Sequence, residues 1–332
     1  MDNILKMNEV TDKDMIINVH HIGGIGECGP TDIISYFKDS ILWYFYDADK
    51  DSLEDISIKN LDEKTNKKYK LINKCIGGKD GKAKFNILNN TSASSVLLPA
   101  KSAENYVIGI LKNKPITWGE HTKLKKTIDI DMHKLDTLIE QKEIGQVDFL
   151  SIDAQGLDYE IIEGMDKNIS SVVGVLCEVE FSQLYEGQKL FADIDIKLRE
   201  KGFRFSTMYN PQIFNHMHYP KCQKDRGFLT VAEVLYLRSS EPLFDELKQD
   251  ISEEEKKKIV IQLIKLAGLS LMFEQFSFSY DIIDKLEKMN LASIKNFSVG
   301  SNHEYIKMLN ELKEGTLKIT FLKYDEKLPN RN

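Results

Sequence analysis

The sequence predicts an α/β protein built on an open, doubly wound sheet. Seven apolar runs of strand length lie between residues 15 and 238, and helical patterns separate several of them. Most of these runs are continuous rather than alternating, which is typical of strands that helices cover on both faces. After residue 240 helical patterns continue without strands. We therefore expect an α/β domain over residues 1–240 and a mostly helical region over 241–332.

The elements follow in a regular order. The predicted strands are MIINVHHI (15–22), ILWYFYDAD (41–49), YKLINKCI (69–76), VDFLSIDA (147–154), VVGVLCEVEF (172–181), FRFSTMY (203–209) and AEVLYLR (232–238). The helical patterns between them are PTDIISYFKDS (30–40), LDYEIIEGM (157–165) and LFADIDIKLREKG (190–202). This alternation favours parallel pairing, because each helix carries the chain back to the start of the next strand.

Two stretches depart from the alternation. Between residues 79 and 136, GKDGKAKFNILNN predicts a hairpin and TSASSVLLPA a loop of small residues. In the C-terminal region, SEEE at 252–255 has the capping serine and early acids of a helix start. Helices are therefore expected through 251–313, as a C-terminal appendage to the sheet.

Composition narrows the class of protein. The chain has 332 residues, 42% hydrophobic and 29% charged, as globular proteins do. Its net charge of −7 gives no electrostatic footprint for nucleic acid, and no run approaches the ~20 apolar residues of a membrane span. The N-terminus lacks the pattern of a signal peptide. Four dispersed cysteines (Cys28, Cys75, Cys177, Cys222) form no CxxC pair, so we expect reduced thiols and a cytoplasmic protein.

A glycine-rich turn follows the first predicted strand. Gly23, Gly24 and Gly26 lead into a helical pattern, and Asp47 ends the second strand 21 residues beyond Gly26. This order matches the turn and the acid that bind the ribose in nucleotide-binding folds. Alternatively, the glycines only make a loop and Asp47 caps a turn. The strict G-x-G-x-x-G fingerprint of dinucleotide binding is not present.

Acidic residues end two further strands. Asp153 closes the strand over 147–154, and Glu178 and Glu180 close the strand over 172–181. Open α/β sheets place ligand-binding groups at the carboxyl ends of their strands, where carboxylates can bind a hydroxyl, an amine or a cation. The structural alternative is a helix cap or an ion pair with a lysine.

The ordered set of these segments resembles the FkbM family of S-adenosylmethionine (AdoMet)-dependent methyltransferases. The likeness covers roughly residues 15–238 and is carried by INVHHIGGIGECGPTDI, WYFYDADKDSLEDI, NNTSASSVL, VDFLSIDAQGLDYEIIEGM and CEVEF. It implies a class I (Rossmann-like) fold: a seven-stranded, mostly parallel sheet whose last strand is antiparallel, with helices on both faces. It also implies AdoMet over the glycine turn, with the acid Asp47 on its ribose. The cofactor residues it implies are Gly23, Gly24, Gly26, Asp47, Ala48, Ile76 and Asp153. The family usually has an acid where this chain has His21.

The resemblance implies O-methylation of a hydroxyl on a saccharide or other small metabolite. Methyl transfer is a displacement at a sulfonium carbon, so the protein aligns the reactants and accepts a proton, without an obligatory metal. Asp153 and Glu178, with Gln155 beside them, are the candidates for the acceptor side. His121, in TWGEHTK (117–123), could act as a base from a mobile lid. The alternative for His121 is an ordinary surface histidine.

Other interpretations stay open. An NAD-linked oxidoreductase would also use a glycine turn and an acid, and a methyltransferase-like binding module would have lost the cofactor. His216, His218 and Cys222 have ligand-type side chains but lack a fourth partner, so no metal is expected. The stretch LSLMFEQFSFSY (269–280) is either helix packing or a partner-binding face, and the C-terminal helices could build a homodimer.

Overall fold

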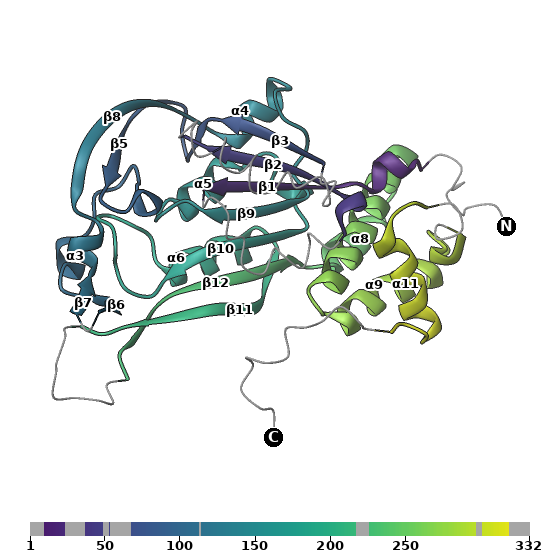
Figure 1. Ribbon diagram of the computed structural model, residues 1–332. Helices are drawn as coiled ribbons and strands as arrows, with labels where there is room; N and C mark the ends of the chain where they lie inside the picture. The colour runs from purple at the N-terminus through teal and green to yellow at the C-terminus, as the bar shows by residue number, and fades with distance from the viewer. Residues whose placement is uncertain are drawn as a thin grey trace.

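A seven-stranded sheet forms the centre of the molecule (Figure 1). The computed structural model describes residues 10–23, 37–48, 53, 68–112, 114–216, 226–296 and 301–318. The strand order is β11-β12-β10-β9-β1-β2-β3. The strands are β1 (Ile17–Gly23), β2 (Ile41–Asp47), β3 (Lys68–Asn73), β9 (Phe149–Asp153), β10 (Gly174–Glu180), β11 (Phe203–Phe214) and β12 (Phe228–Arg238). Each of the seven predicted strands is therefore present.

The sheet is mixed. The pairs β1–β2, β1–β9, β9–β10 and β2–β3 are parallel. The pairs β10–β12 and β11–β12 are antiparallel, so the last strand of the chain lies between two strands that run against it. The carboxyl ends of β1, β2, β9 and β10 consequently meet at one edge of the sheet, where the acidic strand ends were expected.

Helices cover one face of the sheet over a continuous core. Alternate strand residues such as Tyr44, Leu150, Val175 and Tyr236 face these helices and are buried. The helices are α4 (Leu135–Glu140), α5 (Asp158–Gly164) and α6 (Phe191–Glu200). Their segments follow the predicted helices over 157–165 and 190–202.

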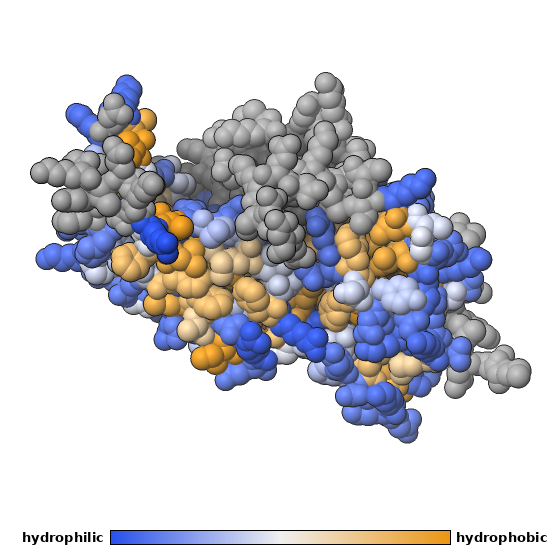
Figure 2. Space-filling model, turned by 90° about the horizontal axis from the view of Figure 1, so that it is seen from below, coloured by the Kyte–Doolittle hydropathy of each residue, from blue (hydrophilic) through white to orange (hydrophobic). Residues whose placement is uncertain are grey.

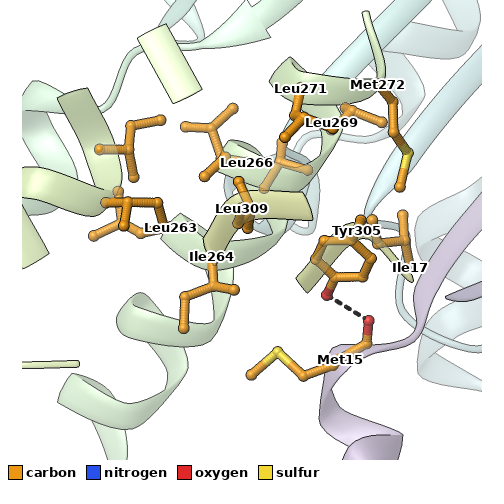
Figure 3. Packing of buried hydrophobic residues seen from close by; sticks show 14 of the residues in the cluster. Met15, Ile17, Leu263, Ile264, Leu266, Leu269, Leu271, Met272, Tyr305 and Leu309 are labelled. Carbon is orange, nitrogen blue, oxygen red and sulfur yellow. Dashed lines mark hydrogen bonds between the residues drawn. The ribbon is translucent and has the colours of Figure 1, made fainter. Parts of the chain in front are cut away.

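The C-terminal helices cover the opposite face, at the amino ends of the strands (Figure 1). They are α7 (Glu241–Glu246), α8 (Glu253–Met272), α9 (Phe276–Lys288) and α11 (Glu304–Glu314). Their apolar side chains share one core with Ile17, Phe149 and Leu237 from the strands. Figure 3 shows this packing and the bond from the Tyr305 hydroxyl to the Met15 carbonyl, at 2.7 Å.

This shared core changes the expectation for residues 241–332. The helical character is as predicted, but the helices pack on the sheet and are not an appendage beyond it. Within the stretch 269–280, Leu269, Met272 and Phe273 are buried in this core, which agrees with the helix-packing interpretation. A folding boundary at residue 240 and a dimer through these helices stay predictions.

The segment of the chain between β3 and β9 forms a second, smaller sheet. It has the order β4-β8-β5, from β4 (Cys75–Ile76), β5 (Gly81–Leu88) and β8 (Leu124–His133). The hairpin predicted within GKDGKAKFNILNN is therefore wrong: β5 pairs with β8, some forty residues later, and β8 separates β5 from β4. The hairpin of this region is β6 (Val107–Leu111) with β7 (Lys114–Thr117), followed by the short helix α3 (Trp118–His121).

Short 3₁₀ helices connect several elements: η2 (Asp12–Met15), η3 (Lys38–Ser40), η4 (Thr91–Ala93), η5 (Lys101–Ala103) and η6 (Ile169–Ser171). The predicted helix over 30–40 lies outside the described residues, except for its end, which forms η3. In the parts of the chain that the structure describes, no helix is long and apolar enough to cross a membrane.

The far ends of β11, β12 and β6 carry exposed apolar side chains. Ile213 is 60% exposed and Phe228 is 66% exposed, and Ile110 in β6 is 66% exposed. Figure 2 views the molecule from the side on which β11 and β12 lie in Figure 1, and apolar side chains gather on this face. Leu229 lies four residues along β12 from Glu233, about 13 Å at the rise of a strand. Apolar surface therefore borders one end of the candidate site described next.

Candidate active site

One row of residues crosses the carboxyl end of the sheet on a single face. Gly23 is paired with Asp153, Glu178 with Glu233, and Glu233 with Tyr209. The β9–β10 register, in which Ile152 is opposite Cys177, sets Asp153 beside Glu178. The β1–β2 register, in which Ile22 is opposite Tyr46, likewise sets Gly23 beside Asp47. We call this row the acidic row: Asp47, Gly23, Asp153, Glu178, Glu233 and Tyr209.

Neighbouring positions of the acidic row are separated by the strand spacing, about 4.8 Å. Asp153 and Glu178 are therefore adjacent, and Asp47 lies two strands from Asp153, roughly 10 Å away. The row is on the same face as Val19, Phe149 and Leu176, which the C-terminal helices bury near the amino ends of the strands. One face of the sheet thus has a core at one end and carboxylates at the other.

The sequence prediction of neighbouring acids at this edge therefore has a direct geometric counterpart. It follows from parallel strands, whose carboxyl ends lie together, and from the residue period of two, which sends residues paired across strands to one face. The roles assigned to Asp153 and Glu178 stay predictions. Glu233 was missed, because it lies in the middle of an antiparallel strand rather than at a strand end.

The Asp153 carboxylate is held from two sides. The Gln155 side-chain amide donates to its Oδ1 at 2.6 Å. His21, on β1, lowers the pKa of Asp153 through its charge, although burial raises that pKa more. The His21 ring is itself fixed by a hydrogen bond between its Nδ1 and the Ser151 hydroxyl, at 2.9 Å. His21 therefore belongs to the environment of Asp153 in this chain.

The carboxyls around Asp153 raise one another's pKa values. Burial raises the pKa of Glu178 well above its ordinary value, and the charge of Asp153 raises it further. Glu180 is buried and its pKa is raised to about 7, chiefly by burial. Burial and the charge of Glu180 also raise the pKa of Asp158 well above its ordinary value. The pKa values of these carboxyls are therefore higher than those of exposed carboxyls, and a bound cation would favour their ionised forms.

Gly23 ends β1 under a tight steric constraint. Its φ is +75°, and a Cβ built there would lie 2.0 Å from the backbone oxygen of Asp153. Glycine is thus required by the close approach of β9, independently of any ligand. Whether Gly23 also contacts a cofactor stays a prediction. Gly24 and Gly26 lie outside the described residues.

The other cofactor candidates lie at the ends of β2 and β4. Asp47 and Ala48 follow each other at the end of β2, and the Asn73 side chain donates to both of their carbonyls, at 3.0 and 3.2 Å. These two hydrogen bonds hold the end of β2 through its backbone. The Asp47 position itself belongs to the acidic row. Ile76 is buried in the core of the other face. Its contact with a cofactor stays a prediction.

His121 is the last residue of α3, and its contacts with Asn90 and Trp118 lie outside the acidic row. Its Nε2 lies 2.6 Å from the Asn90 amide nitrogen, and its ring stacks near Trp118 at 6.1 Å. Burial lowers the pKa of His121, so the imidazole is neutral at physiological pH. Between it and Asp153 the contacts pass through Trp118, Tyr185 and Gln155. A catalytic role for His121 stays a prediction.

Ser95, in the small-residue loop singled out in the sequence, and Tyr185, which the sequence analysis missed, both bind Gln155. The Ser95 hydroxyl donates to the Gln155 carbonyl at 2.7 Å, which joins the small-residue loop to the segment after β9. The Tyr185 hydroxyl lies 2.9 Å from both the Gln155 Oε1 and the Ala93 carbonyl oxygen, so its single proton is shared between two acceptors. Tyr185 belongs to no motif of the sequence, and its only signal was a large aromatic residue soon after a strand.

Metal ligation has little support in the parts of the chain that are described. Among those residues, no group of three or more His, Cys, Asp or Glu side chains is arranged to hold a metal ion. Of the candidate set, His216 is described, and its ring lies 5.5 Å from that of Tyr106. His218 and Cys222 lie outside the described residues. The two described cysteines, Cys75 and Cys177, are free thiols.

The chain was compared with solved structures and with curated sequences. Among solved structures the chain is similar to M. capricolum TrmK in complex with S-adenosyl-homocysteine (11% identity, TM-score 0.30, 92% of this chain and 96% of that chain). It is also similar to a precorrin-6y C5,15-methyltransferase from Geobacter metallireducens (9%, 0.31, 68% and 86%). A third is the 30S ribosomal A1408 methyltransferase from an uncultured bacterium (12%, 0.28, 70% and 95%). No curated protein has a significantly similar sequence.

The family comparison is more direct. The family model of the methyltransferase FkbM domain matches residues 32–205, just over half of the chain. The match begins before β2 and includes the small-residue loop, β9 with Asp153, β10 with Glu178 and the start of β11. The chain therefore belongs to the FkbM family of methyltransferases.

Proposed function

We propose that this protein transfers a methyl group from AdoMet to a hydroxyl of a saccharide or other small metabolite, in the cytoplasm. The single observation behind the proposal is the acidic row in a chain of the FkbM family. Asp47, which we assign to the cofactor, lies in one row on one sheet face with Asp153 and Glu178, which we assign to the acceptor.

The chemistry of these side chains fits AdoMet. The cofactor carries a ribose diol, which a carboxylate such as that of Asp47 binds through two acceptor oxygens. It also carries positive charge on its sulfonium and ammonium groups, and the carboxyls around Asp153 have pKa values that a nearby cation would lower. When bound, AdoMet supplies a methyl group on a positively charged sulfur.

The residues of the chain would then orient the acceptor and take its proton. Asp47 would hold the cofactor at β2, while Asp153 and Glu178 would accept hydrogen bonds from the acceptor hydroxyl. The carbon–oxygen bond would form as the methyl carbon–sulfur bond breaks and S-adenosyl-homocysteine leaves, and the hydroxyl proton would pass to one of these two carboxylates. A carboxylate whose pKa is raised by burial is a stronger base than an exposed one, which suits this step near neutral pH.

The same charges favour an uncharged acceptor over an anionic one. Glu180 and Glu233 add two carboxyls beside the proposed acceptor position, so a phosphate or carboxylate group there would meet repulsion from several directions. Neighbouring sugar hydroxyls, in contrast, can donate to paired carboxylate oxygens. This argues for a polyhydroxylated acceptor and against a nucleic-acid backbone.

Calorimetric titration of the protein with AdoMet, S-adenosyl-homocysteine and NAD tests the proposal. We expect both sulfur compounds to bind and NAD not to bind. Binding of NAD alone would support the oxidoreductase alternative, and binding of none of the three would support a module that has lost its cofactor. Methyl transfer from labelled AdoMet to a panel of glycosides, amines and phosphorylated sugars would then identify the acceptor class. Labelling of amines alone would overturn the assignment to hydroxyls.

A further inference from the structure

Gln155 has a strained backbone that several contacts hold in place. Its φ is +51°, in the left-handed region that a residue with a Cβ seldom adopts. The Ser95 hydroxyl binds its carbonyl oxygen at 2.7 Å. Such conformations persist where the surrounding structure over-determines them, and they concentrate at functional sites. These contacts therefore hold the Gln155 backbone in one conformation, from which its side chain reaches Asp153.

Both ends of the Gln155 side-chain amide are occupied. Its nitrogen donates to the Asp153 Oδ1 at 2.6 Å, and its oxygen accepts from the Tyr185 hydroxyl at 2.9 Å. An ionised carboxylate only accepts, so Asp153 is matched by the amide nitrogen, and the amide oxygen then faces Tyr185. The Tyr185 hydroxyl, by donating to that oxygen, holds the amide in the orientation that presents a donor to Asp153.

Tyr185 is a rigid anchor for this arrangement. Its side chain is 1% exposed, and its ring meets that of Trp118 edge-to-face, with centroids 5.6 Å apart. Its hydroxyl also lies 2.9 Å from the Ala93 carbonyl oxygen, which shares the hydroxyl proton with Gln155. Its backbone nitrogen donates to the Gln188 Oε1 at 3.0 Å, and its backbone forms an isolated antiparallel β-bridge with Pro99. The phenol oxygen therefore has little freedom to move away from Gln155.

We propose that Tyr185 is a positioning residue, which fixes the side-chain amide of Gln155 and through it the orientation of the Asp153 carboxylate toward the methyl acceptor. The catalytic part of this statement rests on the proposed function. The hydrogen-bond relay itself, Tyr185 to Gln155 to Asp153, does not depend on which substrate the protein takes.

The relay predicts a change in the titration of Asp153. The bond from Gln155 lowers the pKa of Asp153, against the larger effect of burial, which raises it. Loss of the Tyr185 hydroxyl would let the amide turn and weaken that bond, so the pKa of Asp153 would rise. The titratable groups that face Asp153 from the surrounding elements stay in place: His21 on β1, Asp158 on α5, Glu178 and Glu180 on β10, and Glu233 on β12.

The experiment follows the carboxyl resonance of Asp153 by NMR in protein labelled with ¹³C-aspartate. The resonance is identified by its absence in Asp153→Asn. In Tyr185→Phe we expect the midpoint of its titration to rise by about 0.5 to 1, since a hydrogen bond contributes about one pKa unit. Gln155→Met, which removes the donor itself, should raise the midpoint at least as far. Tyr236→Phe is the matched control, because that buried tyrosine donates to Asp195 on the other face.

An unchanged midpoint in Tyr185→Phe would overturn the positioning role of Tyr185, and an unchanged midpoint in Gln155→Met would overturn the relay as a whole. An equal rise in Tyr236→Phe would also overturn it, because the effect would then be general. Calorimetry with AdoMet on the same samples separates the two proposals. If the midpoint of Asp153 rises in Tyr185→Phe but the wild-type protein does not bind AdoMet, the relay stands and the proposed function is wrong. If the protein binds AdoMet but the midpoint does not rise, the proposed function stands and the relay is wrong.

Discussion

The buried ion pair between Lys265 and Asp148 offers a sharp test of how the C-terminal helices are held on the sheet. The Lys265 Nζ, on α8, lies 2.8 Å from the Asp148 Oδ2, and the two side chains are 9% and 5% exposed. The same carboxylate oxygen accepts from the backbone nitrogen of Asn18, at 2.8 Å. Asp148 thus joins α8 to the starts of β9 and β1.

Lys265→Met keeps the length of the side chain and removes its charge. The buried Asp148 carboxylate would then retain one backbone donor and no cation. Removing one partner of a buried pair typically costs 3–5 kcal/mol, so we expect the free energy of unfolding at pH 7 to fall by about that amount. Lys258→Met on the exposed side of the same helix is the control, because the Lys258–Glu254 pair is in solvent. Its stability should equal that of the wild type.

The pH dependence identifies the cause. Burial raises the pKa of Asp148, and the charge of Lys265 partly offsets this rise. Without Lys265 the pKa in the folded state rises further above the unfolded value near 3.9. A folded state that binds the proton more tightly gains stability as pH falls through its raised pKa. The loss in Lys265→Met should therefore shrink as the pH falls from 7 toward the unfolded-state pKa of aspartate.

Urea denaturation followed by circular dichroism measures both effects. The double variant Asp148→Asn/Lys265→Met should recover much of the stability, because its neutral amide keeps an acceptor for Asn18 and leaves no buried charge. A loss below about 1 kcal/mol for Lys265→Met, or a loss independent of pH, would refute this account of the pair.

Three further predictions concern the candidate site. Asp47→Ala should weaken AdoMet binding by about 1.5–3 kcal/mol, the usual value of a hydrogen bond to a charged group, and unchanged affinity by calorimetry would contradict the cofactor placement. Asp153→Asn or Glu178→Gln should lower turnover by ~10²–10⁴-fold with AdoMet affinity nearly unchanged; wild-type rates in both variants would remove them from the chemistry. Gly23→Ala should lower the midpoint of thermal unfolding, because its Cβ would overlap the Asp153 carbonyl; a midpoint equal to that of the wild type would show that the strand end can relax.

The strands and their acidic ends could be predicted from the sequence, because the evidence for them is local. A continuous apolar run signals a covered strand, and the next polar residue marks its carboxyl end, as at Asp153 and Glu178. The neighbourhood of these two residues then follows from parallel pairing alone. Pairing between distant segments has no such local signal, so the partner of β5 was predicted wrongly.

The packing of the C-terminal helices could not be predicted, because an apolar helix face does not specify what it covers. A local signal did exist in α8, where Lys265 is the one charged residue among residues 259–272. A lysine at such a position implies a buried partner, but the partner, Asp148, is 117 residues away. The relay through Tyr185 has the same limitation, since its hydroxyl meets Gln155 thirty residues before it in the chain.

One face of the central sheet contains both a buried core and the proposed site, and the two follow one another along the strands. Val19, Phe149 and Leu237 face the C-terminal helices, and one pleat further along the strands His21 and Ser151 bind each other, level with Leu176. The next row contains Asp153 and Glu178. Because the buried row must be covered for the sheet to be stable, while the acidic row must admit ligands, the helices have to end before the strands do. The His21–Ser151 pair marks this boundary, with polar groups that satisfy each other between a dry core and a charged site.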